Sequence, residues 1–354
     1  MHDKVSARRL TRRRILGGLA VAGASVAVAT RVPHAAPDDL SEPQSIEIHA
    51  QPIGAFQRGQ PGARRFGDLE FRGGLVLTSP SSHFGGWSGI AADADGRSFL
   101  SVSDMGTWMS ADLVYDGVRP ARFVNGRIGP LQARGGRALE SKREQDAESV
   151  VLLEGTLDRG TVVIGFERAH RIGRYAIRNR EVRALSGYLK LPPEAKRMQT
   201  NQGTEALAVL QAGPLRGAVV AFAERFTRGS GYHTGWVWIQ GEPHSLHLKD
   251  IDGFNITGAA SLPDGGLLIL ERHFRWMSGV KMRIRRLAQG DIQPGARLTG
   301  RTILGADSDH EIDNMEGISV HKGAKGETVV SLISDDNFNR FLQRTLFLQF
   351  ALDE

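Results

Sequence analysis

The chain has 354 residues, with 45 Lys and Arg, 39 Asp and Glu, and no cysteine, which excludes disulfide scaffolds, thiolate metal sites and cysteine nucleophiles. Residues 1–36 hold seven of the basic residues and one of the acidic ones, so residues 37–354 carry 38 of each and are neutral. The basic surplus that nucleic-acid binding needs is therefore missing from this body. Glycine accounts for 43 of the 354 residues, which is well above its usual share of about 7%. So many glycines indicate many tight turns and hence strands.

The first 36 residues have the pattern of an export signal. Thr11-Arg12-Arg13 precedes a weakly apolar run over residues 15–29, which is shorter than the roughly 20 residues that span a bilayer. A paired arginine before such a run is typical of the twin-arginine signal, which exports folded proteins from the bacterial cytoplasm. We expect a signal peptide and linker over 1–36, engagement of the twin-arginine translocase during export, and one domain over 37–354. A basic tail or an uncleaved anchor is the alternative. The expected location is periplasmic or secreted.

Five segments of the body then repeat one pattern. A small or acidic residue opens a short apolar strand, and a turn leads to a second apolar strand that ends in a charged residue. The opening residues are Ser88, Glu148, Glu205, Thr257 and Glu316, and the closing acids are Asp104, Glu167, Glu224, Glu271 and Asp335. An alternating segment after each hairpin predicts a third strand, and a weaker fourth often follows.

Four strands in every ~57 residues, without an amphipathic helix of useful length, are typical of propeller blades. We expect an all-β propeller of five four-stranded blades whose apolar first strands line a central channel. A degenerate sixth blade and an open β-sandwich are the alternatives. The last repeat has room for about three strands, so residues 46–77 are expected to supply its outer strand and close the ring, which removes exposed strand edges.

The repeat also predicts where the charges meet. The start of one strand and the end of the next lie at the same edge of an antiparallel hairpin, so the opening and closing acids of all blades should surround one channel mouth. Asp146, Asp313 and Asp336 stand beside them, and only Arg168, Arg225 and Arg272 directly oppose them. Crowded carboxylates either keep their protons or bind cations. The structural alternative for the three arginines is that each Glu-Arg pair forms ion pairs with a neighbouring blade.

Oxygen donors without cysteine favour Ca²⁺ or Mg²⁺ over zinc, so we expect a divalent cation, Ca²⁺ in the first place. Asn201, Asn314 and Asn337 are candidate carbonyl ligands beside the acids. The predicted metal-binding residues are Asp104, Asp146, Glu167, Glu224, Glu271, Asn314, Asp335 and Asp336. The predicted catalytic residues are Glu148, Glu205, Glu316, Arg168, Arg225 and Arg272.

Several motifs in a fixed order carry a resemblance to a known family. They are Gly85-Gly-Trp-Ser-Gly89, Ser103-Asp-Met-Gly-Thr-Trp108, Asp146-Ala-Glu148, Phe166-Glu-Arg168, Asn201-Gln-Gly-Thr-Glu-Ala-Leu207, Leu270-Glu-Arg272, Asp313-Asn-Met-Glu-Gly317 and Ser334-Asp-Asp-Asn-Phe338, followed by Gln343-Arg-Thr-Leu346. Over residues 65–352 the chain resembles the phytase-like β-propeller family, labelled "esterase-like activity of phytase". The resemblance implies an exported bacterial propeller and a calcium-assisted hydrolase of phosphate esters.

Charge adds a condition to that function. An acidic mouth repels a phosphate ester unless bound divalent cations invert the local potential and polarise the phosphoryl oxygen. The three opening glutamates are then candidate bases for water, and the three arginines can hold leaving-group charge. We therefore expect a monomeric, metal-dependent hydrolase of a small-molecule ester, with no nucleic-acid partner and no membrane contact after signal cleavage. A non-catalytic Ca²⁺-stabilised binding propeller and a lactonase-like hydrolase are the alternatives.

Overall fold

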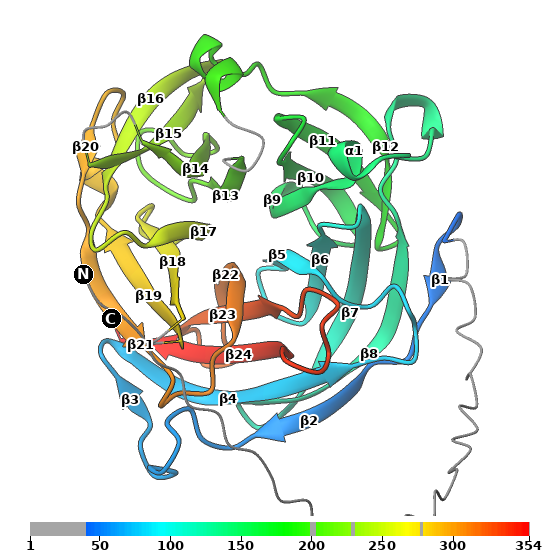
Figure 1. Cartoon of the computed structure of the whole chain (residues 1–354), viewed down its shortest axis with the longest axis vertical. Helices are drawn as coiled ribbons and strands as arrows, with labels where there is room; N and C mark the ends of the chain where they lie inside the picture. The colour runs from blue at the N-terminus through cyan, green and yellow to red at the C-terminus, as the bar shows by residue number, and fades with distance from the viewer. Residues whose placement is uncertain (1–39, 199–202, 228–230, 277–278, 354) are drawn as a thin grey trace, which may run out of the picture. The chain divides into compact units, whose positions relative to one another are not determined.

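A computed structural model describes residues 40–198, 203–227, 231–276 and 279–353 of the chain. Within them almost all regular structure is antiparallel strand, arranged as five sheets around a common axis (Figure 1). Helical structure in the described residues amounts to α1 (Lys142–Gln145) and three short 3-10 turns at Arg134–Gly136, Pro193–Arg197 and Gln289–Asp291. The protein is a five-bladed β-propeller, so the fold class predicted from the repeat is confirmed. The domain boundaries stay a prediction.

We letter the blades A to E in chain order of their innermost strands. Blade A contains β5 (Trp87–Ala92), β6 (Ser98–Ser103), β7 (Thr107–Asp116) and β8 (Arg119–Pro130), with β1 (Gln44–Ser45) at its outer edge. Blade B contains β9 (Ala147–Gly155), β10 (Arg159–Phe166), β11 (Arg171–Arg178) and β12 (Glu181–Tyr188). Blade C contains β13 (Thr204–Val209), β14 (Val219–Thr227), β15 (Tyr232–Ile239) and β16 (Glu242–Lys249), with β20 (Arg297–Leu298) outside.

Blade D contains β17 (Asn255–Ser261), β18 (Leu267–Arg275), β19 (Gly279–Leu287) and β21 (Arg301–Ala306). Blade E contains β22 (Asn314–Lys322), β23 (Thr328–Asp335) and β24 (Thr345–Leu352), followed outward by β4 (Leu69–Thr78) and β2 (His49–Ile53), with β3 (Arg65–Phe66) also on β4. The N-terminal β4 pairs antiparallel with the C-terminal β24, which closes the ring as predicted.

The core lies between neighbouring blades. One cluster of buried side chains joins Leu268 and Ile284 of blade D to Leu332 and Leu346 of blade E, and similar clusters join other neighbours. Because each blade buries both faces, its inner strands are apolar throughout instead of alternating with polar residues. Burial of this apolar area is the main favourable term that holds the blades side by side.

Every innermost strand carries a β-bulge, and the bulges fall at equivalent places in the five blades. The skipped residues are Ser88, Glu148, Glu205, Thr257 and Glu316, the same five that open the sequence repeat. A bulge re-aims the side chain of its extra residue and bends the strand. The repeat therefore encodes a ring of five re-aimed side chains at one level of the channel.

Glycine follows three of the bulges because the inner strands approach each other there. A Cβ on Gly317 would lie 3.0 Å from the backbone nitrogen of Ile90 in blade A, and one on Gly258 would lie 3.0 Å from the carbonyl oxygen of Glu316. Side-chain hydrogen bonds join other neighbours, since the Ser149 hydroxyl donates to the carbonyl oxygen of Thr204 at 3.0 Å. These contacts fix the diameter of the ring at the level of the bulges.

Substitution of Gly317 by alanine should therefore destabilise the propeller by about 1–3 kcal/mol, because the added methyl group meets backbone that cannot move freely. The readout is the free energy of unfolding in urea. The matched control is Gly305→Ala in β21, where no atom lies within 4 Å of the new Cβ and stability should be unchanged or slightly higher. Equal effects of the two substitutions would contradict close packing of the inner strands.

Candidate functional site

Two rings of side chains surround the channel mouth. The inner ring is the set of bulge residues: Ser88, Glu148, Glu205, Thr257 and Glu316. The outer ring is formed by one residue at or near the mouth end of the second strand in each blade. Its members are Asp104, Glu167, Glu224, Arg272 and Asp335, each opposite the residue two places before a bulge. Antiparallel pairing places both rings at one end of the propeller, as the sequence predicts.

The acids of blades B and C form one cluster. Carboxylate oxygens of Asp146, Glu148 and Glu167 lie within 4.8 Å of one another, and so do those of Glu167, Glu205 and Glu224. Glu167 belongs to both groups and joins the two blades. Among the described side chains, no lysine or arginine forms an ion pair with Glu148, Glu167 or Glu205. This cluster has the oxygen donors and the spacing that can enclose a hard divalent cation.

Burial and mutual repulsion raise the pKa values of the cluster. Burial raises the pKa of Glu167 to about 6, with Asp146 and Glu224 adding to the shift. The pKa of Glu148 and that of Glu205 rise well above the ordinary value, first because of burial and then because of neighbouring carboxylates. Without a cation, these three glutamates therefore hold their protons to higher pH than ordinary glutamates do.

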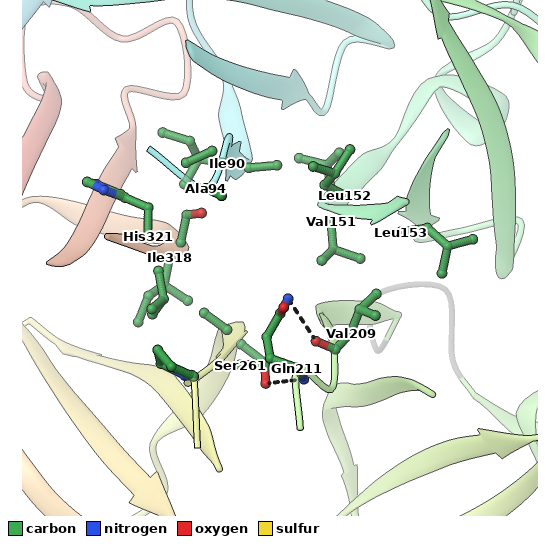
Figure 2. Close-up of a pocket in the computed structure, with 18 of the residues that line it drawn as sticks. Ile90, Ala94, Val151, Leu152, Leu153, Val209, Gln211, Ser261, Ile318 and His321 are labelled. Atoms are coloured by element: carbon green, nitrogen blue, oxygen red, sulfur yellow. Dashed lines mark hydrogen bonds between the residues drawn. The ribbon is translucent and has the colours of Figure 1, made fainter. Parts of the chain in front are cut away.

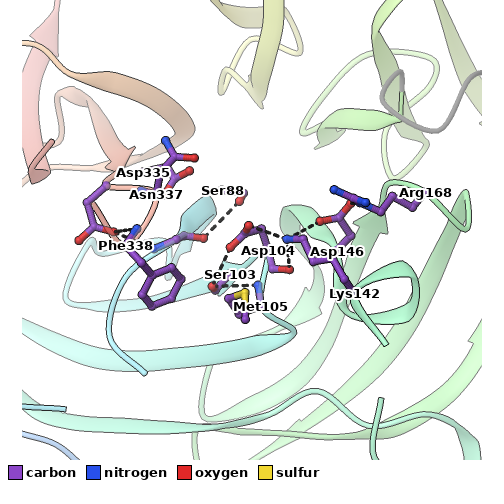
Figure 3. A network of polar contacts seen from close by, with 12 residues as sticks. Ser88, Ser103, Asp104, Met105, Lys142, Asp146, Arg168, Asp335, Asn337 and Phe338 are labelled. Carbon is purple, nitrogen blue, oxygen red and sulfur yellow. Dashed lines mark hydrogen bonds and ion pairs between the residues drawn. The ribbon is translucent and has the colours of Figure 1, made fainter. Parts of the chain in front are cut away.

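Two cations of the chain hold the side of the cluster that faces blade A (Figure 3). The Lys142 ammonium of α1 lies 2.6 Å from an oxygen of Asp104 and 2.7 Å from one of Asp146, and Arg168 lies 2.7 Å from the other oxygen of Asp146. Lys142 comes from the long connection between blades A and B, outside the repeat, and sequence reasoning missed it. Arg168 thus anchors Asp146.

Blades D and E complete the mouth with a charge pair. Arg272 lies 3.3 Å from Glu316 and donates a short hydrogen bond to the side-chain oxygen of Asn314. Burial raises the pKa of Glu316 to about 8, and Asp335 adds to the shift while Arg272 opposes it. Burial also raises the pKa of Asp335 to about 7. Glu316 is therefore largely protonated near neutral pH, although it faces a guanidinium.

Asp336 has a structural role that the sequence did not indicate. Its buried carboxylate accepts the backbone N–H of Gly86 at 3.0 Å and that of Phe338 at 3.1 Å, which ties the β23–β24 loop to blade A. A Cβ on Gly86 would lie 2.5 Å from a carboxylate oxygen of Asp104, so only glycine fits at this junction. Asp313 likewise accepts the backbone N–H groups of Asn314 and Arg344.

Glu271 does not belong to the mouth, and its predicted place there is wrong. In blade D the residue of β18 that pairs with Asn255 is Arg272, so Glu271 stands one position earlier and its side chain points to the other face. It is fully buried inside the blade and ion-paired with Arg283 and Arg285. These two arginines alternate along β19, which is the sequence signal that was overlooked.

Two predicted residues lie outside the described part. The side chain of Arg225 is not described, and neither is Asn201. The eight described acids of the mouth are Asp104, Asp146, Glu148, Glu167, Glu205, Glu224, Glu316 and Asp335, and the three described cations that pair with them are Lys142, Arg168 and Arg272. The excess of acid over base that the sequence predicts is thus present, with Lys142 among the cations.

The channel narrows at the inner ring. A cavity of about 10 Å³ lies among Ser88, Glu205, Thr257 and Glu316, which is room for about one water molecule. Beyond it, toward the opposite face, the inner strands line a vestibule of about 410 Å³, with Ile90, Val151 and Ile318 on its apolar walls and Gln211 and His321 among its polar residues (Figure 2). The mouth and the vestibule are therefore separate chambers.

A larger pocket opens beside the mouth, between blades D and E. It has a volume of about 870 Å³. Its lining includes cationic and amide side chains, among them Arg272, Arg275, Asn314, Asn337 and Gln343, and the apolar Phe274 and Leu342 at its rim. We call it the D–E pocket. Arg272 and Asn314 connect it directly to Glu316 of the inner ring.

Fold and site together define a propeller with an acidic, partly neutralised channel mouth. A family model described as "Phytase-like: Esterase-like activity of phytase" matches residues 82–338. The chain belongs to this family, which confirms the resemblance seen in the motifs. The twin-arginine signal lies in residues outside the described part and stays a prediction. No described helix is long and apolar enough to cross a bilayer.

Solved structures similar to this chain include the Cps50 (Swd1) β-propeller domain of Myceliophteria thermophila, with 12% identity over 87% of this chain and 99% of that chain and a TM-score of 0.40. Raptor from Chaetomium thermophilum is similar over 78% of this chain and 21% of its own, with 13% identity and a TM-score of 0.38. This chain thus spans about a fifth of the Raptor chain. A comparison with curated proteins gives no match.

The raised pKa of Glu316 predicts how stability depends on pH. In the folded state the carboxyl group of Glu316 holds its proton up to about pH 8, whereas a glutamate in the unfolded chain loses its proton near pH 4.5. The metal-free protein should therefore lose stability as the pH rises between these two values. Measurement above pH 6.5, the ordinary histidine value, avoids the opposite contribution of buried histidines such as His233. Urea unfolding should show a smaller loss between about pH 6.5 and 8 for Glu316→Gln than for the wild type. Parallel pH profiles would contradict the assignment.

Proposed function

We propose that the protein is a metal-dependent hydrolase of phosphate or other esters that acts at the acidic channel mouth. The observation that carries this proposal is the cluster of Glu148, Glu167 and Glu205, whose carboxylates lie together without an ion-pairing lysine or arginine among the described side chains. The family description, with its esterase-like activity, supports hydrolysis as the reaction class.

The residues fit a divalent cation better than any other group. Only oxygen donors are present, and both Asp146 and Glu224 extend the cluster around Glu167. Calcium takes six to eight oxygen ligands from flexible carboxylates, and water completes such a shell at an open mouth. When bound, the cation would polarise the ester oxygen and make bound water a stronger nucleophile. It would also offset the negative potential that otherwise repels an anionic ester.

The chain supplies the remaining groups. Arg272 stands between the inner ring and the D–E pocket, where its guanidinium can orient an anionic ester while Asn314 holds its position. Glu316 carries a proton near neutral pH and contacts Arg272, so we assign it proton transfer to the leaving oxygen. Glu148 and Glu205 are then metal ligands instead of bases. Arg168 positions Asp146 and has no direct role in binding the ester.

The route of the substrate follows from the cavities. Because the inner ring leaves only about 10 Å³, the ester enters from the mouth and its bulk occupies the D–E pocket. Arg275 and the amide side chains of that pocket suit a polar or anionic group next to the scissile bond. The pocket therefore favours phosphate esters, with lactones and carboxylic esters as the other substrates to test.

Chelation provides the first test. Treatment with EDTA should abolish hydrolysis of an aryl phosphate, an aryl carboxylic ester or a sugar lactone, whichever the protein accepts, and added Ca²⁺ should restore it. Thermal unfolding followed in the same samples shows whether the fold persists without metal. Absence of turnover on the whole panel in the presence of Ca²⁺, Mg²⁺ or Mn²⁺ would leave the Ca²⁺-stabilised binding propeller as the function. Turnover that resists EDTA would refute metal dependence.

Substitution separates metal binding from proton transfer. Glu205→Gln should weaken Ca²⁺ binding about tenfold or more in a calorimetric titration, because a buried anionic ligand becomes neutral. Glu70→Gln is the matched control, since Glu70 is exposed on β4 of blade E and outside both rings. Glu316→Gln should bind Ca²⁺ normally but lose turnover at saturating substrate. Identical Ca²⁺ titrations of the Glu205 and Glu70 variants would refute the assigned site.

A further inference from the structure

The exposed large apolar side chains of the described residues all lie on the mouth face. They are Met105, Tyr188, Phe274, Trp276, Phe338, Phe341 and Leu342. The second and fourth strands of each blade run toward the mouth, so the β6–β7 turn, the end of β12, the end of β18 and the β23–β24 loop all belong to that face. Scattered apolar residues need no explanation, but a one-sided distribution marks an interaction surface.

Four of these side chains are concentrated at the rim of the D–E pocket. Trp276 is 92% exposed, and Phe274, two residues earlier at the end of β18, is 60% exposed. Phe341 is 94% exposed, and the adjacent Leu342 is 72% exposed. Phe274 and Leu342 line the same pocket from blades D and E. We call these four residues the apolar rim. Its two halves are loop tips that protrude into water on either side of one pocket.

The chain segments that carry the apolar rim are basic. No acidic residue occurs in 272–276, 279–281 or 337–344, whereas Arg275 precedes Trp276 and Arg340 precedes Phe341. Arg275 forms no ion pair with a described side chain, and Arg340 donates to the carbonyl oxygens of Ser81 and Phe84, which leaves its charge unbalanced by an acid. On the neighbouring connection, the carboxylate of Asp307 interacts with His310 and Lys281. Asp313 lines the D–E pocket, where it accepts the backbone N–H groups of Asn314 and Arg344.

We propose that the apolar rim inserts into an anionic lipid surface, with Trp276 and Phe341 at the depth of the headgroups and Arg275 and Arg340 against lipid phosphates. Trp and Phe next to arginine are the residues that anchor proteins at this interface. Four such side chains offer about 600–1,000 Å², which one side of a protein interface could also bury, so the choice of a lipid surface rests on the arginines beside them and on their division between two tips.

This docking needs no membrane-spanning segment, and the sequence analysis, which expected no membrane contact after signal cleavage, did not predict it. It would place the D–E pocket against the lipid headgroups. If the proposed function is right, the substrate would then be an ester carried by an amphiphile. That consequence rests on the proposed function, whereas docking itself does not.

The tryptophans provide a specific probe of the docking. Trp87, Trp108, Trp236 and Trp238 are buried, and residues 1–36 contain no tryptophan, so a change of fluorescence on vesicle addition reports on Trp276. With the full chain, vesicles that contain phosphatidylglycerol should shift the emission to the blue and allow quenching by a lipid-borne quencher. Phosphatidylcholine vesicles should give a weaker effect, and added salt should reduce the binding.

Variants distinguish the rim from other surfaces. Phe341→Ser combined with Leu342→Ser keeps Trp276 as a reporter and should raise the lipid concentration for half-maximal shift about tenfold or more. Tyr188→Ser, at an exposed site away from the rim, should leave the shift unchanged, and Trp276→Ser should abolish it. An unshifted emission in the presence of anionic vesicles, or equal shifts in the Phe341/Leu342 and Tyr188 variants, would overturn the proposal. Concentration-dependent dimerisation that is lost in the Phe341/Leu342 variant would also overturn it and assign the rim to a second copy of the chain.

Binding and catalysis can fail independently. Loss of vesicle binding with unchanged turnover of a soluble ester would remove the docking and leave the proposed function standing. Vesicle binding without any turnover, with or without Ca²⁺, would preserve the docking and remove the proposed function.

Discussion

The structure depends on the close approach of five inner strands around one axis. At the level of the bulges the strands lie so near each other that Gly89, Gly258 and Gly317 leave no room for a Cβ. Close-packed backbone fixes the spacing of the five re-aimed side chains and forces Glu148, Glu205 and Glu316 toward a common axis. Packing thus brings together carboxyl groups that repel one another when they are ionised. The unfolded chain would keep these groups apart.

The chain balances this repulsion unevenly. Lys142 and Arg168 neutralise the side near blade A, and Arg272 neutralises the side near blade E. Between them, Glu148, Glu167 and Glu205 form no ion pair with a lysine or arginine among the described side chains. The described cations therefore lie on both sides of these three carboxylates and do not pair with them. A divalent ion from solution has the charge and the ligand preference to bind these carboxylates, which is why we place the metal there rather than at Asp104 or Asp335.

Sequence analysis found the blades and the inner ring because a repeat compares five copies of the same element, and the bulge residue is the same position in each. It failed in blade D, where Glu271-Arg272 resembles Glu167-Arg168 but is shifted by one residue, and such a shift reverses the face of a strand. It also missed Lys142, because an insertion between blades has no counterpart to compare. Exposed loop tips such as Trp276 escaped notice for a similar reason: exposure depends on what packs nearby, which no local pattern reveals.

The pairing of β4 with β24 has a consequence for biosynthesis. Residues near 70 find their partners near 350, so this pairing forms only after β24 has left the ribosome. Until then blade E has an unprotected edge, and contacts that distant in sequence form slowly. Closure of the ring therefore waits for β24, and a chain without this strand is vulnerable to aggregation and proteolysis. Any cellular process that requires the finished propeller must wait for the last strand.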